Sequence, residues 1–184
     1  MEKIYDTLSL GLKGKLKNIK LIALDFDGVL TDNTVVHLEN GLEGVVRSRA
    51  DSLGVDLLND NGLYDKVNYT SEDHEVDIII MSRESNKVVK SVADKIKVKV
   101  INSLYEKKEA FRGEVERRGL DYSQVLFMGN DMNDIDCVNN AGVGVAVADS
   151  YPEILKVADY VTTRNGGRGA FREVCELILK AKLK

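Results

Sequence analysis

Two aspartates stand two positions apart at the end of a short apolar run: Asp25 and Asp27 follow Leu21–Leu24. If the chain is still extended there, their side chains share one face and lie close together. Two carboxylates that close repel each other unless a cation or a shared proton lies between them. Mg²⁺ suits such oxygen ligands and completes its coordination with water and phosphate oxygens. An aspartate turn or helix cap is the alternative, but the pattern Asp-x-Asp-Gly-Val-Leu-Thr after a buried strand favours a magnesium and phosphate site.

A second polar group, Asn130, Asp131 and Asp134, follows another apolar run, Val125–Met128. Taken alone, these residues could equally begin a helix, because the helix dipole favours aspartate in the first turn. The carboxyl ends of parallel strands meet at one edge of a sheet, so we expect both groups to converge there. The predicted magnesium ligands come from the two groups together, with the choice within the second group left open: Asp25, Asp27, Asn130, Asp131 and Asp134.

Two further positions could hold a phosphoryl group. Ser82 ends the apolar run Val76–Met81, and its hydroxyl could bind a phosphoryl oxygen, although serines end strands routinely. Lys107 and Lys108 begin a predicted helix, where positive charge opposes the dipole. Such a misfit is typical of a lysine that neutralises a phosphate, and a solvated surface charge is the alternative.

The elements that must position these side chains alternate between short apolar strands and amphipathic helices. This alternation predicts an α/β fold, a Rossmann-like parallel sheet with helices on both faces. No repeat or Pro/Gly-rich linker divides the sequence, so one domain spanning 1–184 is expected, with a small β-hairpin flap over 33–47. The predicted strands are 21–24, 35–36, 45–46, 76–81, 98–101, 125–128, 143–147 and 160–162. The predicted helices are 3–17, a segment between Ser48 and Gly62, 86–95, 107–118, 134–140, 152–157 and 170–182, and 64–75 is predicted to be a loop.

Composition narrows the class of protein further. The chain has 184 residues, 43% hydrophobic and 30% charged, as in soluble globular proteins. Its net charge of −4 gives no reason to expect nucleic acid. Its apolar runs are too short to span a bilayer and no signal peptide is evident, so a cytoplasmic protein is expected. Cys137 and Cys175 are expected to be buried free thiols. The two histidines have no third nitrogen or thiolate ligand in a recognisable pattern, so no zinc site is expected.

The order of these motifs resembles the haloacid dehalogenase superfamily, whose four signatures match Leu24–Val29, Ser82, Lys108 and Gly129–Asp134. The resemblance implies a phosphatase without a large cap domain. In it Asp25 would be the nucleophile and Asp27 the general acid/base. Ser82 and Lys108 would hold the phosphoryl group. Mg²⁺ would bind Asp25, the backbone carbonyl of Asp27 and the group that begins at Asn130.

Further segments are similar to one branch of that superfamily: 31–32, 48–54, 147–152 and 160–173. This branch holds 3-deoxy-D-manno-octulosonate 8-phosphate phosphatases, N-acylneuraminate 9-phosphate phosphatases and phosphatase-like domains of acylneuraminate cytidylyltransferases. The resemblance implies a magnesium-dependent phosphomonoesterase that acts on a 2-keto-3-deoxy sugar acid phosphate through an aspartyl-phosphate. It also implies a homotetramer in which a neighbour's hairpin and Gly-rich loop, 163–170, help close the site. The substrate-binding residues would be Arg168, Gly167 and Arg49, with the Arg168 guanidinium matching a carboxylate.

Two other functions stay open. The chain could be a superfamily enzyme for a nucleotide or phosphoserine, although the lack of a large cap disfavours this. It could instead be an oligomerisation module associated with an acylneuraminate cytidylyltransferase, with little or no activity. Asn130 keeps the second alternative open, because it brings no charge where the superfamily usually has aspartate. The segment 64–73 resembles an insertion, and no function is predicted for it.

Overall fold

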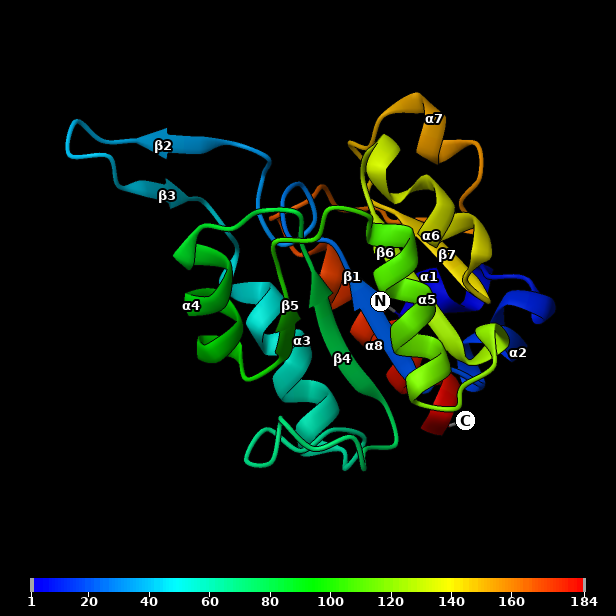
Figure 1. Ribbon diagram of the computed structural model, residues 1–184. Helices are drawn as coiled ribbons and strands as arrows, with labels where there is room; N and C mark the ends of the chain where they lie inside the picture. Colours follow the sequence, from blue (N-terminus) through cyan, green and yellow to red (C-terminus); the bar gives the residue numbers. More distant parts are fainter. Residues whose placement is uncertain (1, 184) are drawn as a thin grey trace.

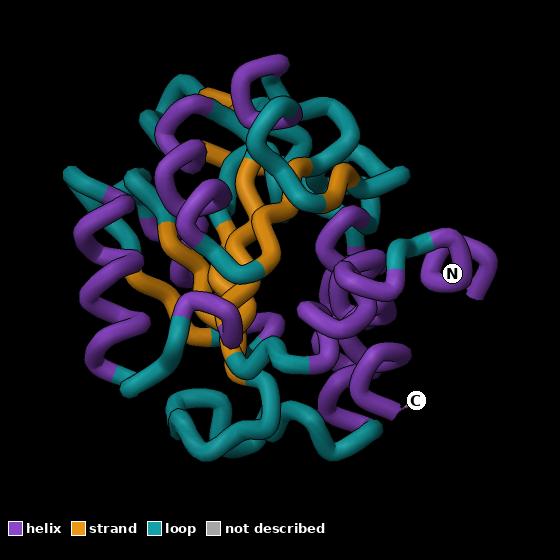
Figure 2. The backbone as a smooth tube through the Cα atoms, turned by 90° about the vertical axis from the view of Figure 1, so that its right-hand side faces the viewer, coloured by secondary structure: helices purple, strands orange, loops and turns teal. Residues whose placement is uncertain are grey.

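A parallel sheet between two layers of helices forms the body of the protein (Figures 1 and 2). The computed structural model describes residues 2–183; Met1 and Lys184, the ends of the predicted domain, lie outside them. Within the described residues the sheet has six strands in the order β5-β4-β1-β6-β7-β8, and every neighbouring pair is parallel. The strands are β1 Leu21–Leu24, β4 Asp77–Met81, β5 Lys99–Ile101, β6 Val125–Gly129, β7 Val143–Ala146 and β8 Tyr160–Val161.

Two helices precede β1, the later helices alternate with the strands of the sheet, and together they cover both of its faces. They are α1 Glu2–Thr7, α2 Leu10–Lys17, α3 Arg49–Asp60, α4 Lys87–Ile96, α5 Lys107–Arg117, α6 Ile135–Asn140, α7 Pro152–Leu155 and α8 Ala170–Leu183, with 3₁₀ turns at Tyr122–Gln124 and Met132–Asp134. A separate antiparallel hairpin is formed by β2 Val35–His37 and β3 Glu43–Val45. The predicted α/β architecture with a hairpin is therefore confirmed.

The central strands are apolar on both faces because each face is covered. In β1, Ile22 and Leu24 belong to the core beneath α2, α3, α4 and α8. Leu21 and Ala23 belong to the core beneath α5, α6 and α7. Side chains alternate between faces along a strand, so a strand buried on both sides reads as a continuous hydrophobic run.

The register brings the ends of the central strands level with one another. Leu24 pairs with Ile80 of β4 and with Met128 of β6. The next backbone amide, that of Asp25, donates to the Met128 carbonyl at 2.9 Å. The residues that directly follow β1, β4 and β6 therefore meet at one edge of the sheet.

The predicted helix over 3–17 is wrong as a single element, because the structure breaks it between Thr7 and Leu10. Ser9 lies between the two pieces with extended dihedral angles, φ −61° and ψ 152°. Its hydroxyl oxygen accepts a hydrogen bond from the Leu12 backbone amide at 3.1 Å. A serine that caps a new helix in this way ends the preceding one. The other predicted strands and helices are found, with ends shifted by a few residues.

The connection from β1 to β4 carries the hairpin, α3 and a loop, and in the described residues no cap domain is inserted there. The hairpin projects away from the sheet, at the upper left of Figure 1. The loop that includes 64–75 has neither helix nor strand, as predicted, and lies below α3. No helix in residues 2–183 combines the length and apolarity needed to cross a membrane.

The contact between α3 and α8 supplies a stability test at Gly54. A Cβ atom there would lie 2.9 Å from the Arg172 Cα and 3.1 Å from the Cys175 Sγ. Gly54→Ala should therefore lower the free energy of unfolding by about 1–3 kcal/mol, because overpacking outweighs alanine's helix preference of about 1 kcal/mol.

Gly113→Ala is the matched control, since a Cβ in this part of α5 meets nothing within 4 Å. This variant should gain up to about 1 kcal/mol. Urea unfolding measures both changes. A Gly54→Ala protein as stable as the control variant would contradict the close packing of α3 on α8.

Candidate active site

A cleft of about 580 Å³ opens at the carboxyl edge of the sheet. It is lined by residues that follow β1, β4, β5 and β6, the position where open α/β sheets bind their ligands. The lining residues are Asp25, Asp27, Asn33, Ser82, Arg83, Glu84, Ser85, Ser103, Leu104, Tyr105, Asn130, Asp131 and Asn133. Two polar groups that lie about a hundred positions apart in the sequence therefore share one cavity, as predicted.

Asp25 is the buried acid at the base of the cleft. Its Oδ1 accepts hydrogen bonds from the Phe26 backbone amide at 2.7 Å and lies 2.9 Å from the Lys107 ammonium. Burial, followed by the nearby carboxylate of Asp134, raises the pKa of Asp25 to about 7, although Lys107 opposes the shift. Asp25 thus lines the cavity while one of its carboxylate oxygens is held by Phe26 and Lys107.

The lysine that lies beside Asp25 in the structure is Lys107, whereas the predicted Lys108 lies at the surface. The Lys107 ammonium lies 2.7 Å from Asp134 Oδ1 and 2.9 Å from Asp25 Oδ1, with only 1% of the side chain exposed. Burial disfavours the charged ammonium, but the Asp25 and Asp134 carboxylates outweigh it and raise the Lys107 pKa. Lys108 is 54% exposed and pairs with Asp136 at 3.3 Å.

Helical spacing explains why Lys107, and not Lys108, faces Asp25, and the sequence could have predicted it. Lys107 lies on the same face of α5 as Phe111 and Val115, which are buried against the sheet. Lys108 shares its face with Arg112, which lies on the surface. Residues four apart stack on one side of a helix, so the apolar stripe of α5 runs through Lys107 and not through Lys108.

The second polar group divides into two parts. Asn130 and Asp131 line the cleft, whereas Asp134 is fully buried behind it. The Oδ2 of Asp134 accepts from the Asn130 backbone amide at 3.0 Å, while its Oδ1 holds Lys107. Asp134 thus positions its neighbours, and Asn130 and Asp131 are the residues of this group that line the cleft.

Glycine makes this close packing possible at Gly129. A Cβ atom on that residue would lie 2.5 Å from the Cβ of Asp134. Any side chain there would push Asp134 away from both of its partners. The glycine that ends β6 is therefore part of the construction of the site.

Asp27 and Ser82 complete the predicted set inside the cleft. Asp27 is half-buried, and this burial, with a contribution from Glu84, raises its pKa to about 6. An acid of that pKa can both donate and accept a proton near neutral pH. Ser82 is buried, its backbone amide donates to the Ile101 carbonyl at 3.0 Å, and its hydroxyl oxygen accepts from the Glu84 amide at 3.1 Å.

The predicted substrate-binding residues lie outside the cleft lining of this chain. Arg168 is 61% exposed and pairs with Asp32 at 2.8 Å. Gly167 has a positive φ of 60°, and its amide donates to the Val29 carbonyl at 2.9 Å. This packs the Gly-rich loop against the turn that follows β1. Arg49 begins α3 and is exposed. Their predicted role therefore has no support from the cleft of a single chain.

Several lining residues were not predicted. Asn33 and Ser103 both have φ of 62°, although neither is glycine. Backbone held in this region is costly and collects at functional sites. Asparagine tolerates a positive φ well, so the sequence weakly indicated this backbone conformation at Asn33. Serine gave no such indication at position 103. The Ser103 amide donates to the Glu84 carbonyl at 3.0 Å, which joins the loops after β4 and β5.

Comparison with known proteins identifies the family. Residues 45–173 match the haloacid dehalogenase-like hydrolase family. The 3-deoxy-D-manno-octulosonate 8-phosphate phosphatase of Escherichia coli strain K12 is 35% identical over 184 residues, covering 98% of this chain and 89% of the relative. The chain therefore belongs to the haloacid dehalogenase-like hydrolase family, which confirms the predicted superfamily and the prediction of a phosphatase enzyme.

Solved structures agree with this assignment. The 3-deoxy-D-manno-octulosonate 8-phosphate phosphatase of Moraxella catarrhalis, in complex with magnesium, phosphate and KDO, has a TM-score of 0.81 at 32% identity, and the match covers 100% of this chain and 94% of that one. The corresponding enzyme of Yersinia pestis has a TM-score of 0.85 at 28% identity over 96% of this chain and 89% of its own. The fold is thus that of a known enzyme class.

The two neighbouring lysines of α5 allow a matched activity test. Lys107→Met should lower kcat/KM for p-nitrophenyl phosphate roughly 100-fold or more, because a preorganised charge facing the reacting group is lost. Lys108→Met should stay within about twofold, because the replaced side chain faces solvent. Circular dichroism establishes that both variants are folded. A larger loss from Lys108→Met than from Lys107→Met would return the role to Lys108.

Proposed function

We propose that this protein is a magnesium-dependent phosphatase of a 2-keto-3-deoxy sugar acid phosphate, with 3-deoxy-D-manno-octulosonate 8-phosphate as the leading substrate. The observation that carries the proposal is the meeting of Asp25, Asp27, Ser82 and Lys107 at the cleft or directly behind it. The named activity of relatives up to 35% identical, which match 98% of the chain, supports the choice of substrate. An N-acylneuraminate 9-phosphate is the related alternative.

The polar side chains of the cleft fit a magnesium ion. No three His, Cys, Asp or Glu side chains within residues 2–183 form a metal-binding group by themselves. The fitting set is mixed: the Asp25 and Asp131 carboxylates, the Asn130 amide oxygen and the backbone carbonyl of Asp27. Mg²⁺ favours such oxygen ligands and leaves room for water and phosphate. When bound, it would offset the repulsion between Asp25 and an incoming phosphate.

The residues of the chain divide the reaction between them. Asp25 attacks phosphorus, forms an aspartyl-phosphate and expels the sugar oxygen, so that one difficult displacement becomes two easier ones. Asp27 donates its proton to the departing oxygen and then takes a proton from the water that hydrolyses the intermediate. Its raised pKa of about 6 suits both steps. Lys107 and Ser82 stabilise the negative charge on the phosphoryl oxygens.

The hairpin supports the further proposal of a homotetramer. Its apolar side chains Val35, Val36, Leu38 and Leu42 are 46–62% exposed, an unusual clustering on a projecting two-stranded element. A neighbouring subunit that covers them would also bring its Gly-rich loop toward the cleft. In that arrangement Arg168 would reach the sugar carboxylate of another subunit, which accounts for its position outside the cleft of its own chain.

Substrate kinetics test the proposed function. Rates of phosphate release are compared for 3-deoxy-D-manno-octulosonate 8-phosphate, N-acylneuraminate 9-phosphate and p-nitrophenyl phosphate, with Mg²⁺ or with EDTA. The octulosonate should give the highest kcat/KM, and EDTA should abolish turnover until Mg²⁺ is restored. A higher kcat/KM for N-acylneuraminate 9-phosphate would make that compound the proposed substrate instead. Turnover in EDTA would remove magnesium from the proposal.

A variant of the proposed nucleophile tests the mechanism separately. Asp25→Asn keeps the shape of the side chain but removes the attacking charge, so phosphate release should fall below about 0.1% of wild type. Circular dichroism serves as the control for folding. A variant that retained wild-type hydrolysis of p-nitrophenyl phosphate would exclude Asp25 as the nucleophile.

A further inference from the structure

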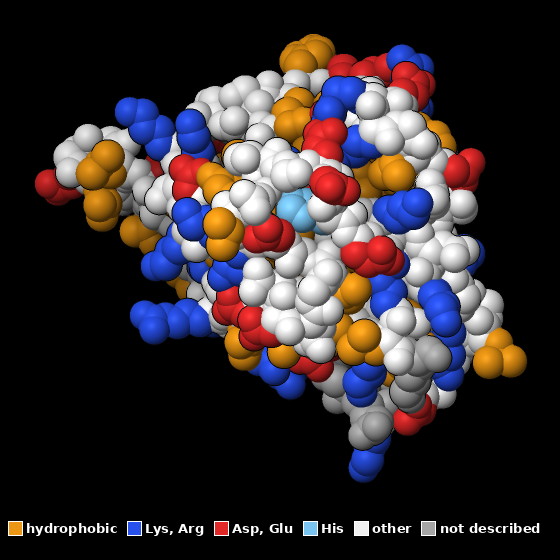
Figure 3. All heavy atoms as spheres, turned by 90° about the horizontal axis from the view of Figure 1, so that it is seen from below, with side chains coloured by type: hydrophobic (Ala, Val, Ile, Leu, Met, Phe, Trp, Pro, Cys, Tyr) orange, Lys and Arg blue, Asp and Glu red, His pale blue; other side chains and the backbone are white. Residues whose placement is uncertain are grey.

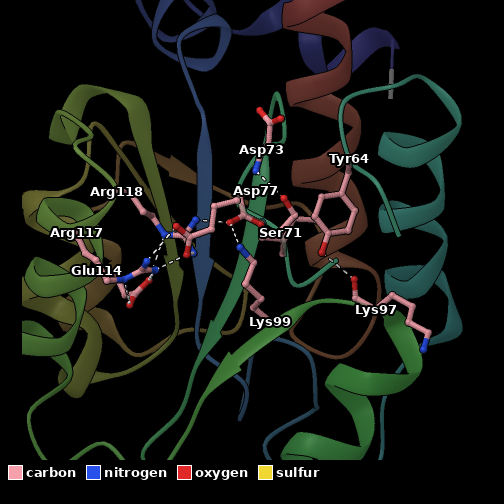
Figure 4. Close-up of polar contacts among 11 residues, drawn as sticks. Tyr64, Ser71, Asp73, Asp77, Lys97, Lys99, Glu114, Arg117 and Arg118 are labelled. Atoms are coloured by element: carbon pink, nitrogen blue, oxygen red, sulfur yellow. Dashed lines mark hydrogen bonds and ion pairs between the residues drawn. The ribbon is translucent and has the colours of Figure 1, made fainter. Parts of the chain in front are cut away.

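A second set of charged residues meets at the amino edge of the sheet (Figure 4). Asp77 begins β4, Lys99 begins β5 and Arg118 follows the end of α5. Glu72 comes from the loop that includes the 64–73 insertion. Figure 3 shows this end of the molecule from below, where acidic and basic side chains are interspersed around a histidine. The insertion is therefore tied into a charged network at the foot of the sheet.

The carboxylates of this network already have partners. Asp77 Oδ2 accepts from the Lys99 ammonium and from Arg118 Nη1, and its Oδ1 accepts from the Ile78 amide. Glu72 accepts two hydrogen bonds from Arg117, at 3.0 and 2.5 Å. Glu114 accepts from both arginines, at 2.7 to 3.1 Å. Each of these three carboxylates is therefore paired with at least one cationic side chain.

Two buried nitrogen atoms at the same place have no hydrogen-bond partner: Arg118 Nη2 and His74 Nε2. The Arg118 side chain is only 6% exposed, and Glu72 Oε1 lies 3.6 Å from Nη2, beyond hydrogen-bonding distance. Both residues border a cavity of about 130 Å³, together with Lys20, Glu72, Asp77 and Leu120. Unpaired buried polar groups are rare in folded proteins and indicate a missing water or ion.

The charge balance favours an anion in this cavity. The described cations of the network and cavity are Lys20, Lys99, Arg117 and Arg118, and the anions are Glu72, Asp77 and Glu114, which leaves one positive charge in excess. Lys20 contributes that excess, since its exposed ammonium makes no ion pair in the described structure. A guanidinium edge beside an ammonium matches a tetrahedral oxyanion, which accepts several hydrogen bonds at once.

We propose that this cavity binds a small tetrahedral oxyanion, phosphate or sulfate, through Arg118 Nη2, His74 and Lys20. The bound anion joins three parts of the chain: the residue before β1, the end of the inserted loop and the end of α5. It would therefore fix the loop to the amino edge of the sheet. This site does not depend on the catalytic proposal, because it shares no residue with the cleft.

Selenate, a heavy analogue of sulfate, tests the site in crystals of the whole protein. Anomalous density should show selenate in contact with Arg118, His74 and Lys20. The matched variant is Lys20→Met with His74→Phe, which keeps the size of both side chains and the ring that lies 4.7 Å from Tyr64. It should lose this density, whereas Lys95→Met, an exposed lysine on α4, should keep it.

A thermal titration tests binding in solution. Sodium sulfate at constant ionic strength should raise the Tm of wild type and of Lys95→Met more than that of the double variant, with saturation. Any sulfate bound in the carboxyl-edge cleft affects all three proteins alike. Water alone in the cavity, density retained in the double variant, or equal Tm rises for all three proteins would each overturn the proposal. None of these outcomes would affect the catalytic assignment.

Discussion

The ammonium of Lys107, enclosed between Asp25 and Asp134, is the interaction on which the site depends. Its three groups come from the start of α5, the end of β1 and the turn after β6, and all are buried. An isolated charge is very costly in such surroundings, so each group is tolerated only while the others are in place. The contact therefore couples assembly of the sheet edge to assembly of the proposed catalytic residues. Gly129 permits it by leaving space for Asp134.

One ammonium between two carboxylates leaves the site short of positive charge. Burial raises the pKa of Asp25 to about 7, and the second carboxylate, Asp134, adds to this shift. A divalent cation at the cleft would reverse the shift and keep Asp25 ionised for attack, because a nearby positive charge favours the carboxylate form. The same elements, β4 and α5, carry Ser82 and Lys107 at one end and Asp77 and Arg118 at the other. The charged network at the amino edge thus holds together the two elements that present the side chains proposed to bind phosphate.

The sequence predicted the layers of the fold and the convergence of its polar strand ends, because both follow from local patterns. Apolar runs marked the strands, and the register of β1 with β4 and β6 made Asp25, Ser82 and Asn130 neighbours. Matching the motif by order alone led to Lys108, whereas the apolar stripe of α5 runs through Lys107 and places that lysine beside Asp25. The φ of Ser103 and the packing of Asp134 behind the cleft depend on tertiary contacts, which no local pattern contains. The division of the predicted helix 3–17 came from Ser9, a residue type that caps helices, and the prediction did not use that local signal.

A double-mutant cycle on Lys107 and Asp134 tests the central interaction most directly. The free energy of unfolding is measured in urea at neutral pH for wild type, Lys107→Met, Asp134→Asn and the double variant. Each single variant should lose about 3–5 kcal/mol, because it leaves a buried charge without its partner. The double variant should lose less than the sum of the two, by about 2 kcal/mol or more. Losses that add to within about 0.5 kcal/mol would show that Lys107 and Asp134 act independently, and would contradict the account.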